Sequence, residues 1–206
     1  MTRPRVVLAT RNPGKLAELR RILAAVPNLD VELVGLESWT DVGEIPETGT
    51  TFAENALLKA YAVAHGTGLP AVADDSGLCA DALGGMPGVL SARWSGRHGD
   101  DAANLSLLLA QLVDVPAARR GAAFVCVAAV MVPGLGERVA EGRLAGVLTR
   151  EPRGRGGFGY DPVFVPLGED RTTAELSAVE KDAISHRGIA FRRLGPLLAE
   201  LLATAP

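Results

Sequence analysis

The first half of the chain alternates short apolar runs with amphipathic stretches, and a long valine-rich pair of segments follows. Val6 to Ala9 is apolar, and the large aliphatic residues from Lys15 to Ala25 recur at helical spacing. Ala122 to Val132 and Arg138 to Val147 flank the turn sequence Pro133-Gly134-Leu135-Gly136, which predicts a long hairpin. Alternation of strands and helices favours parallel strands, whereas a hairpin is antiparallel. The pattern therefore predicts an α/β fold with a mixed sheet.

Local signals predict the remaining elements. Leu69 to Ala73 predicts a short buried strand that ends at the acid pair Asp74-Asp75, so the pair is expected at the strand's C-terminal end. Thr51 to Glu54 and Ser177 to Glu180 both match the capping box that opens a helix. Further segments predict strands over 31–34 and 162–165, and helices from 51 to about 65, over 102–112 and from about 187 to 202.

Composition and charge exclude several classes of protein. The 206 residues are 48% hydrophobic and 22% charged, which fits one folded domain over residues 1–206. The net charge of −3 does not indicate a nucleic-acid-binding surface. No apolar run approaches the roughly 18 residues of a membrane span. Cys79 and Cys126 each lie in an apolar stretch, which is not typical of a disulfide framework. We therefore expect a cytoplasmic protein without a nucleic-acid or membrane partner.

The turn between the first strand and the first helix has the character of a phosphate site. A helix N-terminus offers free N–H groups and a partial positive charge, and Lys15 adds a full charge. Thr10 and Asn12 add side-chain donors, while Gly14 allows close approach. The segment is not a Walker A loop, because Leu16 follows the lysine where that motif has Ser or Thr. An ordinary strand–helix turn is the alternative.

Glu47, Asp74 and Asp75 form the second candidate. Adjacent side chains on an extended chain point to opposite sides, so one aspartate can face a site while the other braces the loop. Carboxylate oxygens suit Mg²⁺, which takes one or two carboxylates plus substrate phosphates and waters. Asn55 and Lys59 are spaced i, i+4 and share a helical face that can look toward the Glu47 loop. A solvated turn with helix-capping acids is the alternative.

The glycine-rich segment Gly154 to Asp161 formally matches the pattern GxGxxG. A strand follows it, whereas the dinucleotide-binding motif needs a helix, so that function is not indicated. Phe158 and Tyr160 on a glycine-rich rim are typical of a platform on which a nucleobase stacks. A flexible loop at the end of a hairpin is the alternative.

The last candidate lies just before the closing helix. His186 and Arg187 can together donate hydrogen bonds to the carbonyl oxygens of a base, and Lys181 adds a cation nearby. Among the 21 basic residues the lysines are Lys15, Lys59 and Lys181, and all of them lie in or beside the candidate segments.

Taken together, these segments resemble the inosine triphosphate pyrophosphatase family, also called Ham1-like proteins. The resemblance runs essentially from end to end, and no single segment carries it alone. The matching segments are Thr10 to Lys15, Glu47-Thr48-Gly49, Phe52 to Lys59, Ala73 to Leu78, Ser91-Ala92-Arg93, Phe158 to Asp161, and Ser185-His186-Arg187. Asp182 departs from the asparagine expected after the lysine, and Arg11 occupies a variable position of the family.

The resemblance implies an elongated mixed β-sheet flanked by helices, in two lobes with the active-site cleft between them, and a homodimer. It implies hydrolysis of ITP, dITP and XTP, which are non-canonical purine nucleotides, to the monophosphate and pyrophosphate with Mg²⁺. Asp75 would be the catalytic base and a metal ligand, with Glu47 as a second ligand. The substrate-binding residues would be Thr10, Arg11, Asn12, Pro13, Gly14, Lys15, Ser76, Phe158, Gly159, Tyr160, Asp161, Lys181, His186 and Arg187.

Two other functions compete with this interpretation. A Maf-type pyrophosphatase would act on pyrimidine or modified nucleotides, and the Ser185-His186-Arg187 cluster argues against it. A nucleotide-binding module without catalysis would have no use for Asp74 and Asp75, because carboxylates repel phosphate unless a metal intervenes.

Overall fold

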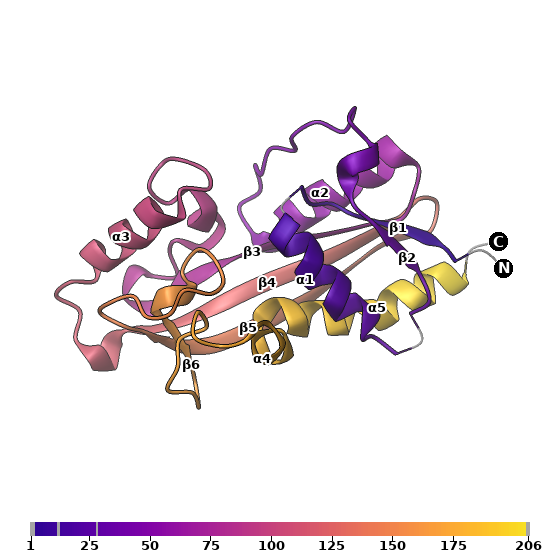
Figure 1. Ribbon diagram of the computed structural model, residues 1–206. Helices are drawn as coiled ribbons and strands as arrows, with labels where there is room; N and C mark the ends of the chain where they lie inside the picture. Colours follow the sequence, from indigo (N-terminus) through magenta and orange to yellow (C-terminus); the bar gives the residue numbers. More distant parts are fainter. Residues whose placement is uncertain (1–2, 12, 28, 205–206) are drawn as a thin grey trace. The chain divides into compact units, whose positions relative to one another are not determined.

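The computed structural model describes residues 3–11, 13–27 and 29–204 (Figure 1). The strands are β1 (Arg5–Leu8), β2 (Glu32–Val34), β3 (Ala71–Ala80), β4 (Gly121–Val132), β5 (Gly136–Leu148) and β6 (Phe164–Pro166). The α-helices are α1 (Pro13–Ala24), α2 (Phe52–Thr67), α3 (Asp101–Gln111), α4 (Ala178–Ile184) and α5 (His186–Ala203).

The strands form one six-stranded sheet in the order β2-β1-β3-β4-β5-β6. β1 pairs in parallel with β2 and with β3, whereas β5 and β6 are antiparallel. A short turn joins β4 to β5, as the Pro133 to Gly136 sequence predicts. The predicted mixed α/β sheet is therefore confirmed. The predicted strand at 162–165 is shorter and later, because Asp161–Val163 forms a 3₁₀ turn before β6.

The chain divides into two compact units, which we call unit 1 and unit 2. Unit 1 comprises residues 1–75, 126–142 and 187–206, and unit 2 comprises residues 76–125 and 143–186. Each unit has buried apolar residues of its own, with Phe191 in unit 1 and Phe124 and Phe164 in unit 2. The prediction of a single domain and of a cleft between two lobes stays a prediction.

In unit 1, helices cover both faces of the sheet. Successive side chains of a strand point to opposite faces, and here both sets are apolar. Val6, Leu8 and Val72 pack in one cluster with residues of α1 and α5. Val7, Ala71 and Ala73 pack on the other face, against residues of α2. The helical periodicity of α1 is confirmed, since Leu16, Leu19, Ile22 and Leu23 are buried.

Both predicted capping boxes are present. Thr51 accepts a hydrogen bond from the Glu54 amide, and the Glu54 carboxylate accepts one from the Thr51 amide at the start of α2. Ser177 and Glu180 make the same reciprocal pair at the start of α4. α2 ends at Gly68, whose φ of 71° is the left-handed conformation that glycine adopts without strain.

The predicted end of β3 is wrong. The strand continues through Asp74-Asp75-Ser76-Gly77 to Ala80, so the acid pair lies in its middle. Leu78 and Ala80 are buried in the core of unit 2, which gives the strand apolar partners beyond the acids. Buried cations compensate the acids, as described below.

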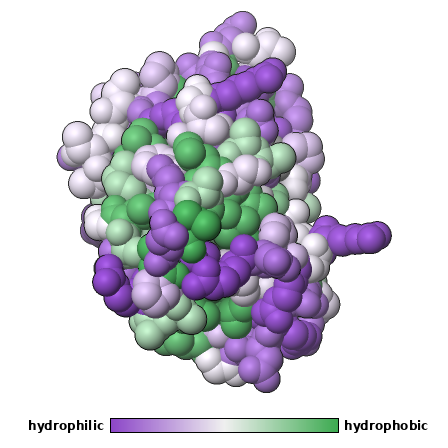
Figure 2. All heavy atoms as spheres, turned by 90° about the vertical axis from the view of Figure 1, so that its left-hand side faces the viewer, coloured by the Kyte–Doolittle hydropathy of each residue, from purple (hydrophilic) through white to green (hydrophobic). Residues whose placement is uncertain are grey.

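Apolar side chains gather on the face of the molecule shown in Figure 2, which is the left-hand side of Figure 1, where α3 lies. Leu107 on α3 and Val113 just after it are among the exposed apolar residues of unit 2. Within the described ranges, no helix has both the length and the hydropathy that crossing a membrane requires.

Candidate functional site

Asp74 and Asp75 lie side by side in β3 and face different layers of unit 1. Both are 5% exposed. Asp74 contacts Lys15 of α1 and Arg187 of α5, whereas Asp75 contacts residues of α2. The predicted opposite orientation of the two side chains is therefore confirmed, although the pair lies within a strand and not at a loop. Its cause is the alternation of side chains along a strand that has helices on both sides.

On the α2 face, two polar side chains contact Asp75, and one of them also contacts Glu47. The amide Nδ2 of Asn55 donates to its Oδ2 at 3.0 Å, and Lys59 Nζ lies 3.6 Å from its Oδ1. The same ammonium donates to Glu47 Oε1 at 2.8 Å. Asn55 and Lys59 thus share a helical face that looks toward Glu47, as predicted. Two carboxylates from separate segments converge on one ammonium.

Burial raises the pKa of Asp75 above its usual range, although Lys59 and Asn55 act in the opposite direction. A carboxylate with a raised pKa is a stronger base than an exposed one. Burial alone would lower the pKa of Lys59, but Asp74, Asp75 and Glu47 together raise it. Lys59 therefore stays charged. Its ammonium contacts the carboxylates of Asp75 and Glu47, and carboxylate oxygens gathered in this way can also hold a divalent cation.

The α1 and α5 face holds a chain of buried charges. Asp74 Oδ2 lies 3.2 Å from Arg187 Nε and 3.6 Å from Lys15 Nζ. Arg187 also donates from a terminal nitrogen to Glu18 Oε2 at 2.9 Å. Burial by itself would raise the pKa of Asp74, but Lys15 and Arg187 hold it well below its usual range. Asp74 is therefore an ionised brace for these cations.

Arg187, which is predicted to read the base, is held in a buried chain of ion pairs, and its role toward a base stays a prediction. Its side chain is 2% exposed and lies between the carboxylates of Asp74 and Glu18. A buried guanidinium needs such partners because leaving it unpaired is costly. Sequence reasoning missed Glu18. The signal was available, because this acid lies between Leu16 and Leu19 on the apolar face of α1.

The predicted phosphate segment leads into α1, with Pro13 as the first helical residue and Lys15 in the first turn. The Lys15 side chain is 24% exposed, and its ammonium points to Asp74. Arg11 donates to the carbonyl oxygens of Val42 and Trp39. These carbonyls belong to the stretch before Glu47, so Arg11 ties the two segments together. Of the other predicted residues here, Thr10 and Gly14 flank α1's start, and Asn12 lies outside the described residues.

In unit 2 the carboxylate of Asp161 organises the segment Phe158–Asp161, which we call the base loop. Asp161 Oδ2 accepts from the Phe158 amide at 2.8 Å and from Lys181 Nζ at 2.5 Å, and Oδ1 accepts from Thr173. Phe158 is 41% exposed, and Lys181 Nζ lies 5.0 Å from its ring centroid. An exposed aromatic face with a fixed cation beside it suits a flat, electron-rich ligand.

Two residues of the predicted base pocket are buried in unit 2. The ring of Tyr160 lies in the core, and its hydroxyl donates to the Ser91 carbonyl at 2.9 Å. Burial raises the pKa of Tyr160, so its hydroxyl stays a neutral donor. His186 stacks on Phe124 with centroids 4.8 Å apart. Tyr160 thus differs from the predicted stacking platform, because the apolar core takes its ring and leaves Phe158 exposed. Ser76 is half-buried in β3, directly after Asp75.

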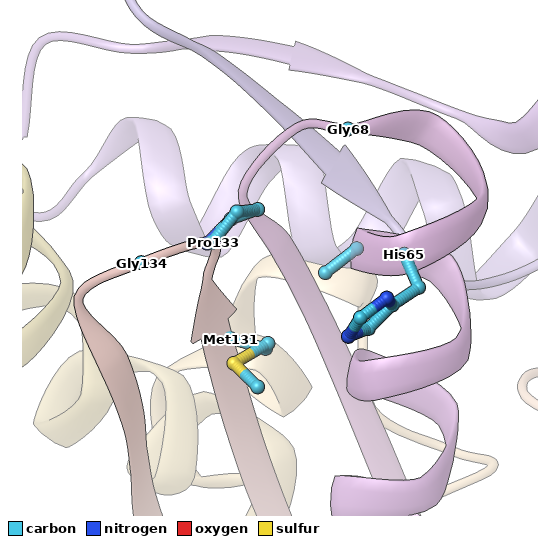
Figure 3. A pocket seen from close by; sticks show the side chains of 6 residues that line it. His65, Gly68, Met131, Pro133 and Gly134 are labelled. Atoms are coloured by element: carbon cyan, nitrogen blue, oxygen red, sulfur yellow. The ribbon is translucent and has the colours of Figure 1, made fainter.

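A separate surface hollow of about 240 Å³ lies in unit 1 at the end of α2 and the turn between β4 and β5 (Figure 3). His65 and Met131 point into it, and Pro133 borders it. His65 also packs against the ring of Tyr61 with centroids 4.2 Å apart. The residues predicted for substrate or metal binding do not line this hollow.

Comparisons with known proteins agree with the resemblance seen in the sequence. The model of the Ham1 family matches residues 6–197. A dITP/XTP pyrophosphatase of Streptomyces avermitilis is 64% identical over 198 residues, which cover 96% of this chain and 98% of that protein. A crystal structure of a nucleoside-triphosphatase / dITP/XTP pyrophosphatase from Mycobacterium abscessus is 58% identical with a TM-score of 0.75, covering 94% of this chain and 98% of that one. A HAM1 protein from Coxiella burnetii is 42% identical with a TM-score of 0.84, covering 96% and 99%.

Proposed function

The chain belongs to the Ham1 family, and on this basis we propose that it hydrolyses dITP, XTP and ITP to the nucleoside monophosphate and pyrophosphate. It is an enzyme, a nucleoside triphosphate pyrophosphatase that acts on non-canonical purine nucleotides. The observation that carries the proposal is the convergence of Asp75 and Glu47 on Lys59, because it supplies a base and a cation-attracting pair at one point.

The metal proposed for this site is Mg²⁺, held by Glu47 and Asp75. The donor set fits, because both ligands are hard carboxylate oxygens and Mg²⁺ usually takes one or two carboxylates, with phosphates and waters completing its shell. Among the described residues there is no group of three or more His, Cys, Asp or Glu side chains suited to a metal. A Mg²⁺ site with two protein carboxylates, in which substrate oxygens are the other ligands, is consistent with the absence of a larger cluster among these residues. When bound, the ion would neutralise charge on the triphosphate and its leaving group.

Asp75 is proposed to act as the general base. It takes one proton from a water whose oxygen attacks the α-phosphorus, so a new P–O bond forms. The bond from the α-phosphorus to the bridging oxygen breaks, and that oxygen leaves with its electron pair as part of pyrophosphate. Asn55 and Lys59 hold the Asp75 carboxylate in place for this transfer. Lys15 at the start of α1 is proposed to bind the phosphates together with Thr10 and Gly14.

Base recognition is proposed to rest on unit 2. ITP and XTP carry a carbonyl at purine position 6, where ATP carries an amino group. Phe158 offers the exposed ring on which the base stacks, and Lys181 is a donor beside that ring. A hydrogen-bond donor there can donate to the carbonyl oxygen, whereas it meets the amino group of ATP as donor against donor. Sites of this kind can discriminate by about 10⁴-fold. The Asp161 carboxylate supports this arrangement by accepting from the Phe158 amide and from Lys181 Nζ, and His186 is proposed as a further substrate-binding residue.

The assembly proposed is a cytoplasmic homodimer, as the family resemblance implies. The apolar face in Figure 2 supports an interface between two copies, because monomers rarely expose large apolar patches. Sedimentation equilibrium of the purified protein tests this proposal. A mass twice that of the 21.4 kDa chain is expected, and a monomer across the micromolar range would contradict it.

The function is tested by product analysis with the purified protein. With Mg²⁺ and dITP we expect dIMP and pyrophosphate in equal amounts, and no activity in excess chelator. Mn²⁺ should restore the activity after chelation. UTP in place of dITP is the control for a Maf-type enzyme, so faster hydrolysis of UTP would contradict the proposal. Binding of dITP without release of pyrophosphate would instead indicate a binding module.

A further inference from the structure

Hydrogen bonds at three successive residues fix the base loop, one inside the loop and two to other parts of unit 2. The Phe158 amide donates to Asp161 Oδ2 inside the loop, and the Tyr160 hydroxyl donates to the Ser91 carbonyl in the core. Between these two points the Gly159 amide donates to Asp101 Oδ2 at 2.8 Å. This third bond links the loop to α3, and it is the one that lies at the surface.

Asp101 is the first residue of α3, and its carboxylate is not needed to cap that helix. The cap is Asp100, whose side chain accepts from the Ala103 amide at 3.1 Å. Asp101 instead uses its carboxylate for Gly159. A hydrogen bond from an amide to an ionised acceptor is roughly twice as strong as one between neutral groups.

The geometry of Gly159 makes this contact specific. Its φ is 60°, a conformation that residues with a side chain adopt only with strain. The turn thereby presents the Gly159 N–H to α3. Because the amides of Phe158 and of Gly159 both have carboxylate acceptors, the peptide units on either side of Phe158 are fixed. The direction in which the exposed Phe158 ring leaves the backbone is fixed with them.

We propose that Asp101 is a positioning residue for base recognition, which holds the Phe158 ring in place through the Gly159 amide. This inference rests on the proposed function, in which Phe158 stacks on the purine. Asp101 has no part in the attack on the phosphorus, so its contribution belongs to substrate affinity and base discrimination. Loss of the contact frees the ring, which then stacks less well on dITP and less selectively against dATP.

The experiment compares Asp101→Ala, which removes the acceptor, with Asp101→Asn, which keeps an acceptor oxygen but loses the charge. Asp114→Ala is the matched control, because Asp114 is an exposed acid of unit 2 three residues beyond the end of α3. Hydrogen exchange of a peptide that contains Gly159 reports the contact directly, without any substrate. Steady-state kinetics with dITP and dATP report its effect on recognition.

For Asp101→Ala we expect faster exchange in that peptide, a rise of about tenfold in KM for dITP, a kcat within about twofold, and a smaller ratio of kcat/KM for dITP over dATP. Asp101→Asn should recover part of each change, because its neutral amide oxygen still accepts from the Gly159 amide but more weakly, and Asp114→Ala should match the wild type. Equal losses in the Ala and Asn variants would overturn the inference, because they would assign the effect to the charge on α3. Wild-type exchange and KM in Asp101→Ala would overturn it as well.

The wild-type control separates this inference from the function on which it rests. If the wild type hydrolyses dITP while Asp101→Ala matches it in KM and selectivity, the positioning role fails and the proposed function stands. If the wild type releases no pyrophosphate from dITP, the proposed function fails and the inference falls with it.

Discussion

Asp74 and Asp75 are the same residue type at neighbouring positions, and their surroundings shift their pKa values in opposite directions. Both are buried, yet the pKa of Asp74 is held low and that of Asp75 is raised. Lys15 and Arg187 account for the low pKa of Asp74, because their charges outweigh the cost of burying the carboxylate. At Asp75 the cost of burial outweighs Lys59 and Asn55. Asp74 is therefore an ionised partner of two cations, and Asp75 is a more basic carboxylate. The difference arises because different helices pack on the two sides of β3.

The raised pKa of Asp75 predicts where activity fails in acid. Catalysis needs the ionised carboxylate, so kcat/KM should fall as the pH drops through the raised pKa of Asp75, which lies above the ordinary aspartate value of about 3.9. The measurement is kcat/KM for dITP against pH at constant Mg²⁺, with circular dichroism to confirm that the protein stays folded. An acid limb at or below the ordinary value would contradict the role given to burial.

The low pKa of Asp74 makes it a group that stabilises the fold at neutral pH and loses this contribution in acid. A depressed carboxyl pKa contributes stability above the unfolded value of about 3.9, and that stability is lost as the pH falls toward the folded pKa. Arg187→Met should lower the free energy of unfolding at neutral pH by about 3–5 kcal/mol, because it leaves Asp74 and Glu18 without the guanidinium that they share.

Urea unfolding measures this loss, with Arg20→Met on the exposed side of α1 as the control. The double variant Arg187→Met with Glu18→Gln should lose less than the sum of the two single changes, because the second change removes the unpaired acid. An Arg187→Met variant as stable as the control would show that the charge chain is not what holds α1 and α5 to Asp74.

At the scale of elements, the sequence predicts well whatever depends on near neighbours. The capping boxes, the periodicity of α1 and the hairpin of β4 and β5 are all confirmed, since each depends on residues a few positions apart. The predicted end of β3 is wrong because cations distant in sequence compensate its acids: Lys15 and Arg187 contact Asp74, and Lys59 contacts Asp75. No local rule predicts a strand through two buried aspartates.

Gly77 also cannot be explained from its neighbours in sequence. A glycine is needed there because residues of another element lie close to its Cα. A Cβ there would collide with the Gly88 carbonyl oxygen and the Ser91 hydroxyl, whose oxygen also accepts from the Leu78 amide. Gly77→Ala should therefore lower the free energy of unfolding by about 1–3 kcal/mol. Gly43→Ala is the control, because a Cβ at Gly43 meets nothing within 4 Å. Equal stabilities of the two variants would refute the packing argument.

At the scale of the whole molecule, the two units hold different parts of the proposed chemistry. Unit 1 carries Asp75, Glu47 and Lys15, and unit 2 carries the base loop with Lys181. The spacing of Asn55 and Lys59 predicted that Lys59 looks toward Glu47, and the structure shows the two in contact. The substrate-binding roles that the resemblance implies stay predictions. The resemblance did not predict that Arg187 and Tyr160 are buried, because burial depends on the packing of distant segments.

The central claim is that Asp75 is the base of a nucleotide pyrophosphatase. Its most direct test is the initial rate of pyrophosphate release from saturating dITP and Mg²⁺ by the wild type and by Asp75→Asn. Asp41→Asn, which changes an exposed aspartate of unit 1, is the control. The amide keeps the shape of the side chain but not its basicity, so kcat should fall by about 10²-fold or more, while Asp41→Asn keeps the wild-type rate. A turnover near the wild-type value in folded Asp75→Asn would contradict the account.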